Sequence, residues 1–202
     1  MSAGTRVLVT DIGSVLFRFD PDHRFALLEE RTGRPRAELD RLLFASGFET
    51  RCEAGEFTAD EIRDRVAEMT GFEGTTEELS NLWTSAFTLD EEVLQSLTDS
   101  GLTLAIFSNN GPLFADYFAG RFPEAAKWFR HRYFASNLKA RKPDEAAFET
   151  VTARLHDALG TAPYELLLID DNRQNSAAAV AAGWQAHTFA GPSTLRDLLT
   201  EA

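Results

Sequence analysis

The chain has 202 residues with 32 acidic and 20 basic side chains, and its formal net charge of -12 argues against a nucleic-acid-binding surface, which needs clustered Lys and Arg. Its length suits one domain carrying a small insert, and a hydrophobic content of 44% is enough for a sizeable core. Cys52 is the single cysteine, which excludes an intrachain disulfide, and no apolar run is long enough to span a bilayer, so we expect a cytoplasmic protein without a membrane partner.

The first predicted element is a buried β-strand close to the N-terminus. Residues 7–10 form a compact β-branched and apolar run, Asp11 stands where the run ends, and Gly13 follows two positions later. Ligands of open parallel sheets bind beyond the carboxyl ends of the strands, so this position places a carboxylate beside a reacting space. Gly13 allows a tight turn and a close approach of the backbone. The alternative for Asp11 is an ordinary residue of a surface turn.

The next segment has a different pattern, with helical spacing of its apolar positions and no strand between the helices. Thr58 and Thr75 stand before acidic first turns and predict helix starts. The predicted helical stretches are 23–31, 35–44, 59–69 and 76–87. Such a block does not fit directly into a sheet. We therefore expect residues 21–87 to form a small helical insert, with residues 1–20 and 88–202 as the core domain.

Strands and helices alternate in the rest of the chain. Predicted strands cover residues 102–107, 133–135, 166–169 and 186–189. Predicted helices cover residues 91–99, 145–159, 177–182 and 195–199, and another begins at 114–118. Alternation of this kind implies right-handed crossovers and a parallel sheet. The expected fold class is α/β, with a Rossmann-like parallel sheet and a helical domain inserted after the first strand.

Three of the predicted strands end in polar residues, which should meet at one edge of the sheet. The groups are Asp11, then Ser108-Asn109, then Asp170-Asp171. Adjacent carboxylates are costly unless a positive charge compensates them. Asp11, Asp170, Asp171 and the carbonyl of Gly13 form a hard-oxygen set that suits Mg²⁺. Taken singly, Ser108-Asn109 is typical of a turn, and Asp170-Asp171 of a helix cap.

Lys142 precedes a predicted helix, and a lysine in this place neutralises the acidic cluster and holds a phosphate. Its alternative is a solvated surface charge. The common order and strand-end placement of all four groups favour a single site.

These segments resemble the haloacid dehalogenase (HAD) superfamily of hydrolases over nearly the whole chain. Residues 11–15 are similar to its first motif and Ser108-Asn109 to its second. Lys142-Pro143 is similar to the third motif and Asp170-Asp171 to the fourth. The helical insert resembles the small cap domain of the superfamily. Asn175, three residues after Asp-Asp-Asn, adds a similarity to bacterial sugar-phosphate phosphatases of the glucose-1-phosphate phosphatase type.

The resemblance implies a Mg²⁺-dependent phosphatase that acts on a small phosphorylated metabolite, with a sugar phosphate favoured. Asp11 is the expected nucleophile and forms an aspartyl phosphate. Ser108 and Asn109 are expected to donate hydrogen bonds to the phosphoryl oxygens, and Lys142 to add a positive charge. Mg²⁺ is expected on Asp11, Gly13 and Asp171, with Asp170 assisting.

One position departs from many phosphatases of the superfamily, which carry a second Asp two residues after the nucleophile as general acid and base. This chain has Gly13 there. An anomeric sugar hydroxyl is more acidic than an ordinary alcohol and therefore leaves more easily without a general acid, which favours a sugar 1-phosphate as substrate. Two alternatives stay open: a haloacid dehalogenase, which uses an Asp nucleophile without a metal, and a non-catalytic binding module of the same fold.

The insert is also expected to act as a cap that is hinged at residues 19–22 and 88–90 and selects the substrate. We expect Trp83 to lie in the core of the insert and Cys52 to be an ordinary small apolar residue.

Overall fold

A sheet of five parallel strands forms the centre of the computed structural model, which describes residues 6–160 and 165–200. The strand order is β5-β4-β1-β6-β7, and each neighbouring pair is parallel. The strands are β1 (Arg6–Thr10), β4 (Thr103–Ser108), β5 (His131–Phe134), β6 (Glu165–Asp170) and β7 (Gln185–Thr188). These bounds lie close to the predicted ranges. The predicted α/β fold with a parallel sheet is confirmed.

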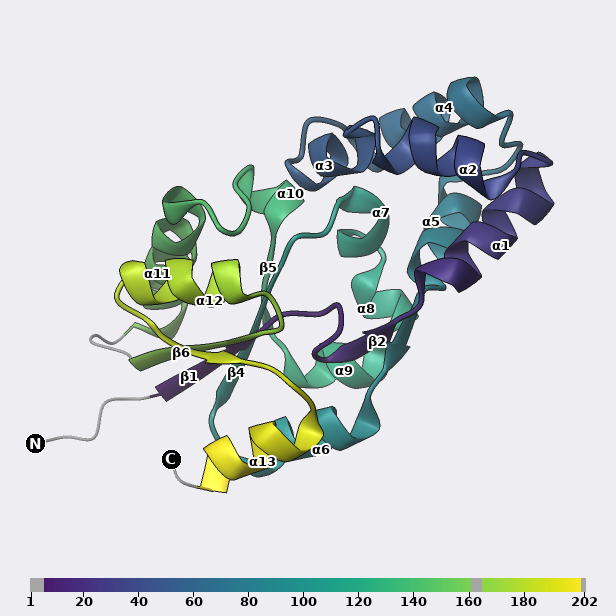
Figure 1. Cartoon of the computed structure of the whole chain (residues 1–202). Coiled ribbons are helices and arrows are strands. Elements are labelled where there is room, and N and C mark those ends of the chain that lie inside the picture. The colour runs from purple at the N-terminus through teal and green to yellow at the C-terminus, as the bar shows by residue number, and fades with distance from the viewer. Residues whose placement is uncertain (1–5, 161–164, 201–202) are drawn as a thin grey trace, which may run out of the picture.

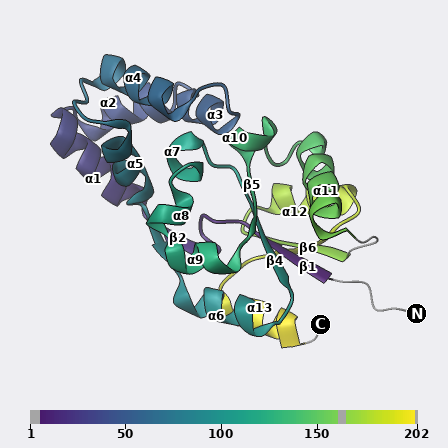
Figure 2. The same ribbon diagram turned by 180° about the vertical axis from the view of Figure 1, so that it is seen from behind.

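Helices cover both faces of the sheet. They include α6 (Glu91–Asp99), α11 (Glu145–Leu159), α12 (Arg173–Ala181) and α13 (Pro192–Thr200). Leu8 of β1 packs in one apolar cluster with residues of α6 and α13, whereas Val9 packs in another with residues of α11 and α12. Figures 1 and 2 show the sheet between these two layers. Burial on both faces explains why the strands are continuously apolar rather than alternating.

The segment between β4 and β5 contains short helices in place of the single helix that the sequence predicts from 114–118. They are α7 (Pro112–Ala115), α8 (Phe118–Arg121) and α9 (Pro123–Trp128), and α10 (Ala135–Leu138) follows β5. Proline begins α7 and α9, where its missing N–H costs nothing. Phe122, between α8 and α9, packs 4.6 Å from Phe17 between ring centroids. Aromatic packing therefore fixes the segment between β4 and β5 against the core, although this segment contains no long helix.

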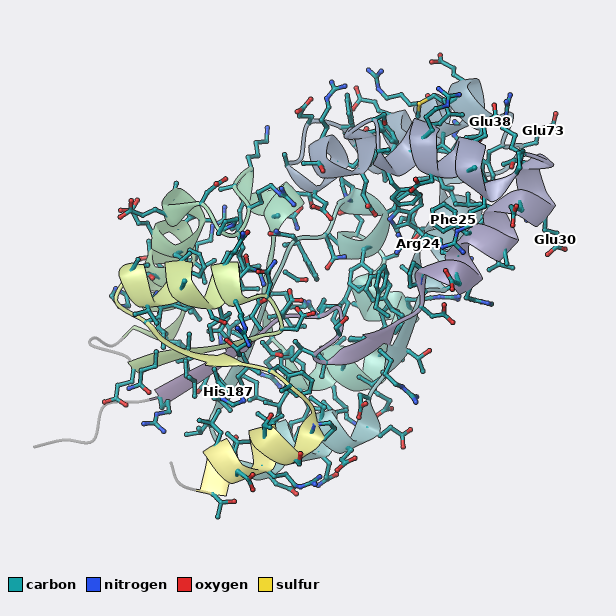
Figure 3. All side chains as sticks on the ribbon, viewed as in Figure 1. Arg24, Phe25, Glu30, Glu38, Glu73 and His187 are labelled. Carbon is teal, nitrogen blue, oxygen red and sulfur yellow. The ribbon has the colours of Figure 1, made fainter. Side chains whose placement is uncertain are left out.

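The helical block comprises α1 to α5 and lies beside the core, at the upper right of Figure 1. Its elements are α1 (Pro21–Thr32), α2 (Arg36–Leu39), a π-helical turn (Asp40–Phe44), α3 (Phe48–Glu53), α4 (Ala59–Thr70) and α5 (Thr76–Thr84). Thr58 and Thr75 form the predicted capping boxes. An apolar cluster that includes Leu28, Leu43 and Leu79 fills the block, and Leu113 of α7 joins it from the core. Glu30 and Glu73 lie on its outer side, whereas the buried Arg24 lies on the inner side (Figure 3).

A two-stranded antiparallel ribbon joins the helical block to the core. Its strands are β2 (Phe17–Phe19) and β3 (Phe87–Leu89), and Arg18 pairs with Thr88. The sequence predicts a hinge from residue 19 at the first, and at the second the end of a helix followed by a hinge. Each strand is three residues long, and its pairing partner lies about seventy residues away, so no local pattern reveals it.

In the described part of the chain, none of the helices combines the length and the apolar character needed to cross a lipid bilayer.

Candidate active site

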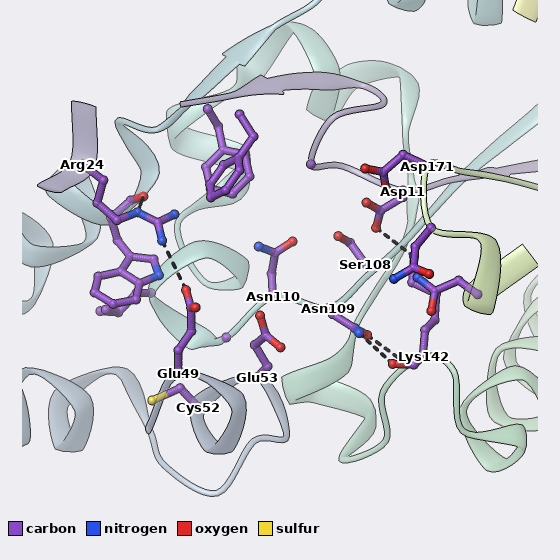
Figure 4. A pocket seen from close by; sticks show the side chains of 18 of the residues that line it. Asp11, Arg24, Glu49, Cys52, Glu53, Ser108, Asn109, Asn110, Lys142 and Asp171 are labelled. Carbon is purple, nitrogen blue, oxygen red and sulfur yellow. Dashed lines mark hydrogen bonds and ion pairs between the residues drawn. The ribbon is translucent and has the colours of Figure 1, made fainter. Parts of the chain in front are cut away.

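The polar residues that end three strands lie together at one edge of the sheet, as the sequence predicts. β1 lies between β4 and β6, so Asp11, Ser108 and Asp170 belong to neighbouring strands. The backbone N–H of Asp11 donates to the carbonyl of Ile169 at 2.9 Å, which extends the β1–β6 pairing to this residue. Asp11 and Ser108 are both buried, and Figure 4 shows their side chains pointing toward the same space.

Lys142 lies between the two buried carboxylates and is itself 1% exposed. Its Nζ donates to Asp11 Oδ1 at 2.8 Å, to Asp170 Oδ2 at 2.5 Å and to the carbonyl of Phe107 at 2.7 Å. All three protons of the ammonium group therefore have acceptors. Burial alone disfavours the charged form, but the two carboxylates outweigh it and hold the pKa of Lys142 above its ordinary value.

Asn109 holds the backbone of Lys142 in place. Its Nδ2 donates to the carbonyl of Lys142 at 2.8 Å, and its Oδ1 accepts from the N–H of Lys142 at 2.9 Å. Because both ends of the amide are used, its side chain positions the lysine. The amide nitrogen carries a second proton that these two bonds do not use, so the side chain still has a donor for a phosphate.

Asp170 is fully buried and hydrogen-bonded on both carboxylate oxygens. Besides Lys142, Asn175 Nδ2 donates to the two oxygens at 3.0 and 3.1 Å, and the N–H of Asn172 donates at 2.9 Å. Asp170 is thus committed to positioning Lys142. Asn175, which the sequence analysis noted only through the family resemblance, holds that carboxylate in place.

The remaining predicted metal-binding groups line an open cavity. Asp11, Gly13 and Asp171 face it, but Asp170 is absent from its lining. Among residues 6–160 and 165–200, no three His, Cys, Asp or Glu side chains gather closely enough to hold a metal ion. The available donors are therefore two carboxylates and a main-chain carbonyl. Loss of solvent and the charges of Asp11 and Asp170 raise the pKa of Asp171, so a cation that relieves this repulsion fits the site.

The cavity has a volume of about 440 Å³ and lies between the core and the helical block. The helical block and the ribbon contribute its apolar wall through Phe19, Ile62, Trp83 and Phe87. Trp83 is buried, as expected, and one side of it also faces the cavity. A cavity that combines apolar walls with a few polar groups is typical of sites for small ligands.

A buried ion pair, which the sequence analysis did not identify, lies on the helical-block side. Arg24 of α1 is 3% exposed and donates from Nη1 to Glu49 Oε1 at 3.2 Å. Its Nε donates to the carbonyl of Trp83 at 3.1 Å, and its guanidinium lies 4.7 Å from the Trp83 ring centroid. Figure 4 shows this group at the end of the cavity away from Asp11.

Glu53 is a second acidic residue of α3 that faces the cavity. It lies four residues after Glu49, one helical turn along the same face. Arg141 Nη2 donates to Glu53 Oε2 at 2.8 Å and links the helical block to the core next to Lys142. Burial and the charge of Glu49 raise the pKa of Glu53 to about 7, although Arg141 acts in the opposite direction. The spacing of Glu49 and Glu53 could have placed both acids on one face of a helix, but the sequence analysis did not predict α3.

The chain belongs to the haloacid dehalogenase-like hydrolases, because the model of that family matches residues 5–183. A comparison with curated proteins finds no match. The membership confirms the family that the motifs indicate, while the resemblance to glucose-1-phosphate phosphatases stays a prediction.

Solved structures of HAD proteins share the fold. A HAD-family enzyme from Bacteroides thetaiotaomicron is 22% identical with a TM-score of 0.75, covering 92% of this chain and 94% of that one. That enzyme has also been crystallised with magnesium and inorganic phosphate. A protein from Porphyromonas gingivalis described as a predicted HAD-like family hydrolase is 21% identical (TM-score 0.70; coverage 92% and 91%). The L-2-haloacid dehalogenase of Xanthobacter autotrophicus is 17% identical (TM-score 0.59; coverage 90% and 76%).

Proposed function

We propose that this hydrolase is a Mg²⁺-dependent phosphatase that cleaves a small phosphorylated metabolite, with a sugar phosphate favoured, through an aspartyl phosphate on Asp11. The observation that carries the proposal is the contact of Asp11 with the ammonium group of Lys142 in the wall of a cavity that Asp171 also lines. A carboxylate in this place is accessible, oriented and next to a positive charge, which are the requirements of a nucleophile that attacks an anion.

Each residue has a distinct role in the proposal. Asp11 attacks phosphorus, and the ammonium of Lys142 orients it and attracts the anionic phosphoryl group. The hydroxyl of Ser108 lies beside Asp11 and donates to a phosphoryl oxygen (Figure 4). Asn109 adds its main-chain N–H and fixes Lys142. Preorganised donors of this kind stabilise charge in the transition state without reorganising during the reaction.

Asp11, Asp171 and the carbonyl of Gly13 would hold Mg²⁺. All three are oxygen donors, and their number matches the way Mg²⁺ binds a few protein groups and keeps several waters. When bound, Mg²⁺ supplies positive charge that offsets repulsion between the carboxylates and the phosphate. The Bacteroides thetaiotaomicron enzyme, with its magnesium and phosphate complex, supports this proposal.

We further propose that residues 21–87 act as a cap domain over a core of residues 1–20 and 88–202. The apolar cluster of the helical block, which takes only Leu113 of α7 from the core among its described buried members, and the contribution of the block to the cavity wall support this division. Because the ribbon β2–β3 is the covalent connection, we expect the cap to move about it. Closure would exclude water while Asp11 attacks, and opening would release the products.

The test is phosphate release from p-nitrophenyl phosphate and a panel of sugar phosphates, with Mg²⁺ and with EDTA. We expect Mg²⁺-dependent turnover that Asp11→Asn abolishes while the melting temperature is retained, because an amide is a poor nucleophile of the same shape. Halide release from a 2-haloacid that survives EDTA would instead identify a dehalogenase. Ligand binding without turnover of any of these substrates would identify a binding module.

A further inference from the structure

Gly13 leaves the proposed reaction without an acid next to the nucleophile. A side chain starting there would meet the ring of Phe87 at 3.8 Å from its Cβ, so the wall of the cavity is aromatic at this point. An alkyl leaving group departs slowly as an alkoxide, and protonation by a positioned acid accelerates such steps about a hundred- to ten-thousandfold. A proton donor for the leaving oxygen must therefore come from elsewhere on the cavity wall.

The described lining of the cavity offers few candidates for this donor. Its titratable side chains are Asp11, Arg24, Glu49, Cys52, Glu53, Lys142 and Asp171. Asp11, Lys142 and Asp171 are assigned to the phosphate end. Burial raises the pKa of Cys52 to about 12, which makes it too weak an acid. Arg24 is a permanent cation, and Glu49 pairs with it at the end of the cavity away from Asp11 (Figure 4), so Glu53 remains.

Glu53 has the position that the role requires. Figure 4 shows its carboxyl pointing into the cavity between the Glu49 end and the Ser108 end. The charge of Asp11 contributes to the raised pKa of Glu53, after burial and the charge of Glu49. Its Oε2 accepts from Arg141, while Oε1 has no partner among the described residues. One oxygen is therefore anchored and the other is available to a ligand.

Resting on the phosphatase activity proposed above, we propose that Glu53 is the general acid and base of this enzyme and that the cap supplies it to the core. In the first step an oxygen of Asp11 bonds to phosphorus, and the bond from phosphorus to the leaving oxygen breaks. Its electron pair stays on that oxygen, which takes the proton of the Glu53 carboxyl and leaves as a neutral alcohol.

In the second step the carboxylate of Glu53 takes a proton from a water molecule as the water oxygen bonds to phosphorus. The bond from phosphorus to Asp11 breaks, and its electron pair restores the Asp11 carboxylate. One water is consumed, one alcohol and one phosphate are formed, and Glu53 is again protonated. The cycle balances without any further reactant.

The surroundings of Glu53 suit both steps. A pKa of about 7 makes both forms available near neutral pH, which is the condition for an efficient acid and base. Burial and Glu49 on its own helix raise that pKa, Arg141 on the core lowers it, and Asp11 adds a smaller rise. Because Glu53 belongs to the cap and Arg141 to the core, the acid is anchored only while the cap is seated.

The experiment compares Glu53→Gln with wild type on two substrates across pH 5–9 with saturating Mg²⁺. Glycerol 2-phosphate has a poor leaving group, and p-nitrophenyl phosphate has one that needs no protonation. We expect kcat for glycerol 2-phosphate to fall at least about a hundredfold and kcat for p-nitrophenyl phosphate to fall less than about tenfold. The wild type should also lose activity on glycerol 2-phosphate above pH about 7, a limb absent from Glu53→Gln. Titration of the substrate affects the wild type and Glu53→Gln equally, so it cannot produce a difference between their pH profiles.

Glu56→Gln is the matched control, because Glu56 is exposed, lies outside the cavity lining and pairs with Arg51. It should retain the wild-type rates and profile, and Glu53→Asp should restore the alkaline limb at a reduced rate. Equal losses on both substrates, or an unchanged pH profile in folded Glu53→Gln, would overturn the role of Glu53 as acid and base but not the proposed phosphatase activity. A wild type that hydrolyses neither ester would overturn the proposed phosphatase activity as well.

Discussion

On the core side of the cavity, the ammonium of Lys142 makes three hydrogen bonds and Asp170 is bonded on both oxygens, so neither side chain can move alone. On the helical-block side, Glu53 accepts one hydrogen bond and retains 20% side-chain exposure. The first arrangement fixes groups that must be in place for every substrate. The second leaves room to adjust to the molecule that carries the phosphate. The comparison indicates that the strand ends fix the nucleophile and the groups that bind the phosphate, whereas the cap carries groups that adjust to the rest of the substrate, including the proposed acid Glu53.

Removing the central cation of the core side should have the largest effect. Lys142→Met leaves Asp11 and Asp170 buried without their partner, which should cost about 3 kcal/mol or more of unfolding free energy. Turnover should fall at least about a hundredfold, because a charge that faces the phosphate is lost. Urea denaturation and steady-state kinetics measure the two effects.

Lys139→Met is the matched control, because Lys139 is an exposed lysine three residues before Lys142. It should leave both quantities unchanged. Similar stability in the two variants would show that the buried lysine does not hold the core side together.

A change at Asp171 should be confined to the metal. Asp171→Ala removes one proposed Mg²⁺ ligand but leaves the Lys142 contacts intact, so the Mg²⁺ concentration for half-maximal activity should rise about ten- to a hundredfold. Its melting temperature without metal should equal or exceed that of the wild type, because crowding with Asp11 and Asp170 is relieved.

Asp197→Ala provides the comparison for loss of an aspartate away from the cavity, because Asp197 is an exposed residue of α13 that does not line it. If Asp171→Ala keeps the wild-type Mg²⁺ requirement, the metal site has been assigned to the wrong residues.

A change in the apolar wall of the cavity, which the connecting ribbon and the cap form together, should alter the choice of substrate more than the transfer of the phosphoryl group. Phe19 lines the cavity and is 40% exposed, and its ring lies 5.0 Å from that of Phe87. Phe19→Ala should change the ratio of kcat/KM between two sugar phosphates roughly three- to tenfold. The rate on p-nitrophenyl phosphate should change less.

Trp128→Ala removes an aromatic side chain of similar exposure that does not line this cavity. An equal change in substrate ranking for both variants would count against selection by this apolar wall.

The core side could be predicted from the sequence because it depends on strand ends. Asp11, Ser108 and Asp170 each follow an apolar run, and parallel strands bring such positions together whatever the details of packing. Even there, the commitment of Asp170 to Lys142 and Asn175 emerges only from the distances.

The cap side could not be predicted in the same way. Glu53 faces Arg141 across 88 residues of sequence, and the ribbon pairs Phe17 with Leu89. α3 has six residues, too few for a helical period to stand out. Contacts between the cap and the core depend on how the two pack against each other, which no local sequence pattern encodes.

The smallest expected effect comes from Arg141, the group of the core that contacts the cap acid. Its charge lowers the pKa of Glu53, so Arg141→Gln should raise that pKa and keep the carboxyl protonated to higher pH. Because the acid form protonates the leaving oxygen, the alkaline limb on glycerol 2-phosphate should move upward, not downward. The pair is partly solvent-exposed, so the expected shift is about half a pH unit.

Arg51→Gln breaks a comparable ion pair with Glu56 on the outside of the same helix and should leave the limb in place. A downward shift in Arg141→Gln, or equal shifts in both variants, would show that Arg141 does not act on the acid. An upward shift confined to Arg141→Gln would mean that the core sets the protonation of a residue carried by the cap. In that case the two sides of the cavity, although held differently, operate as one site once the cap is seated.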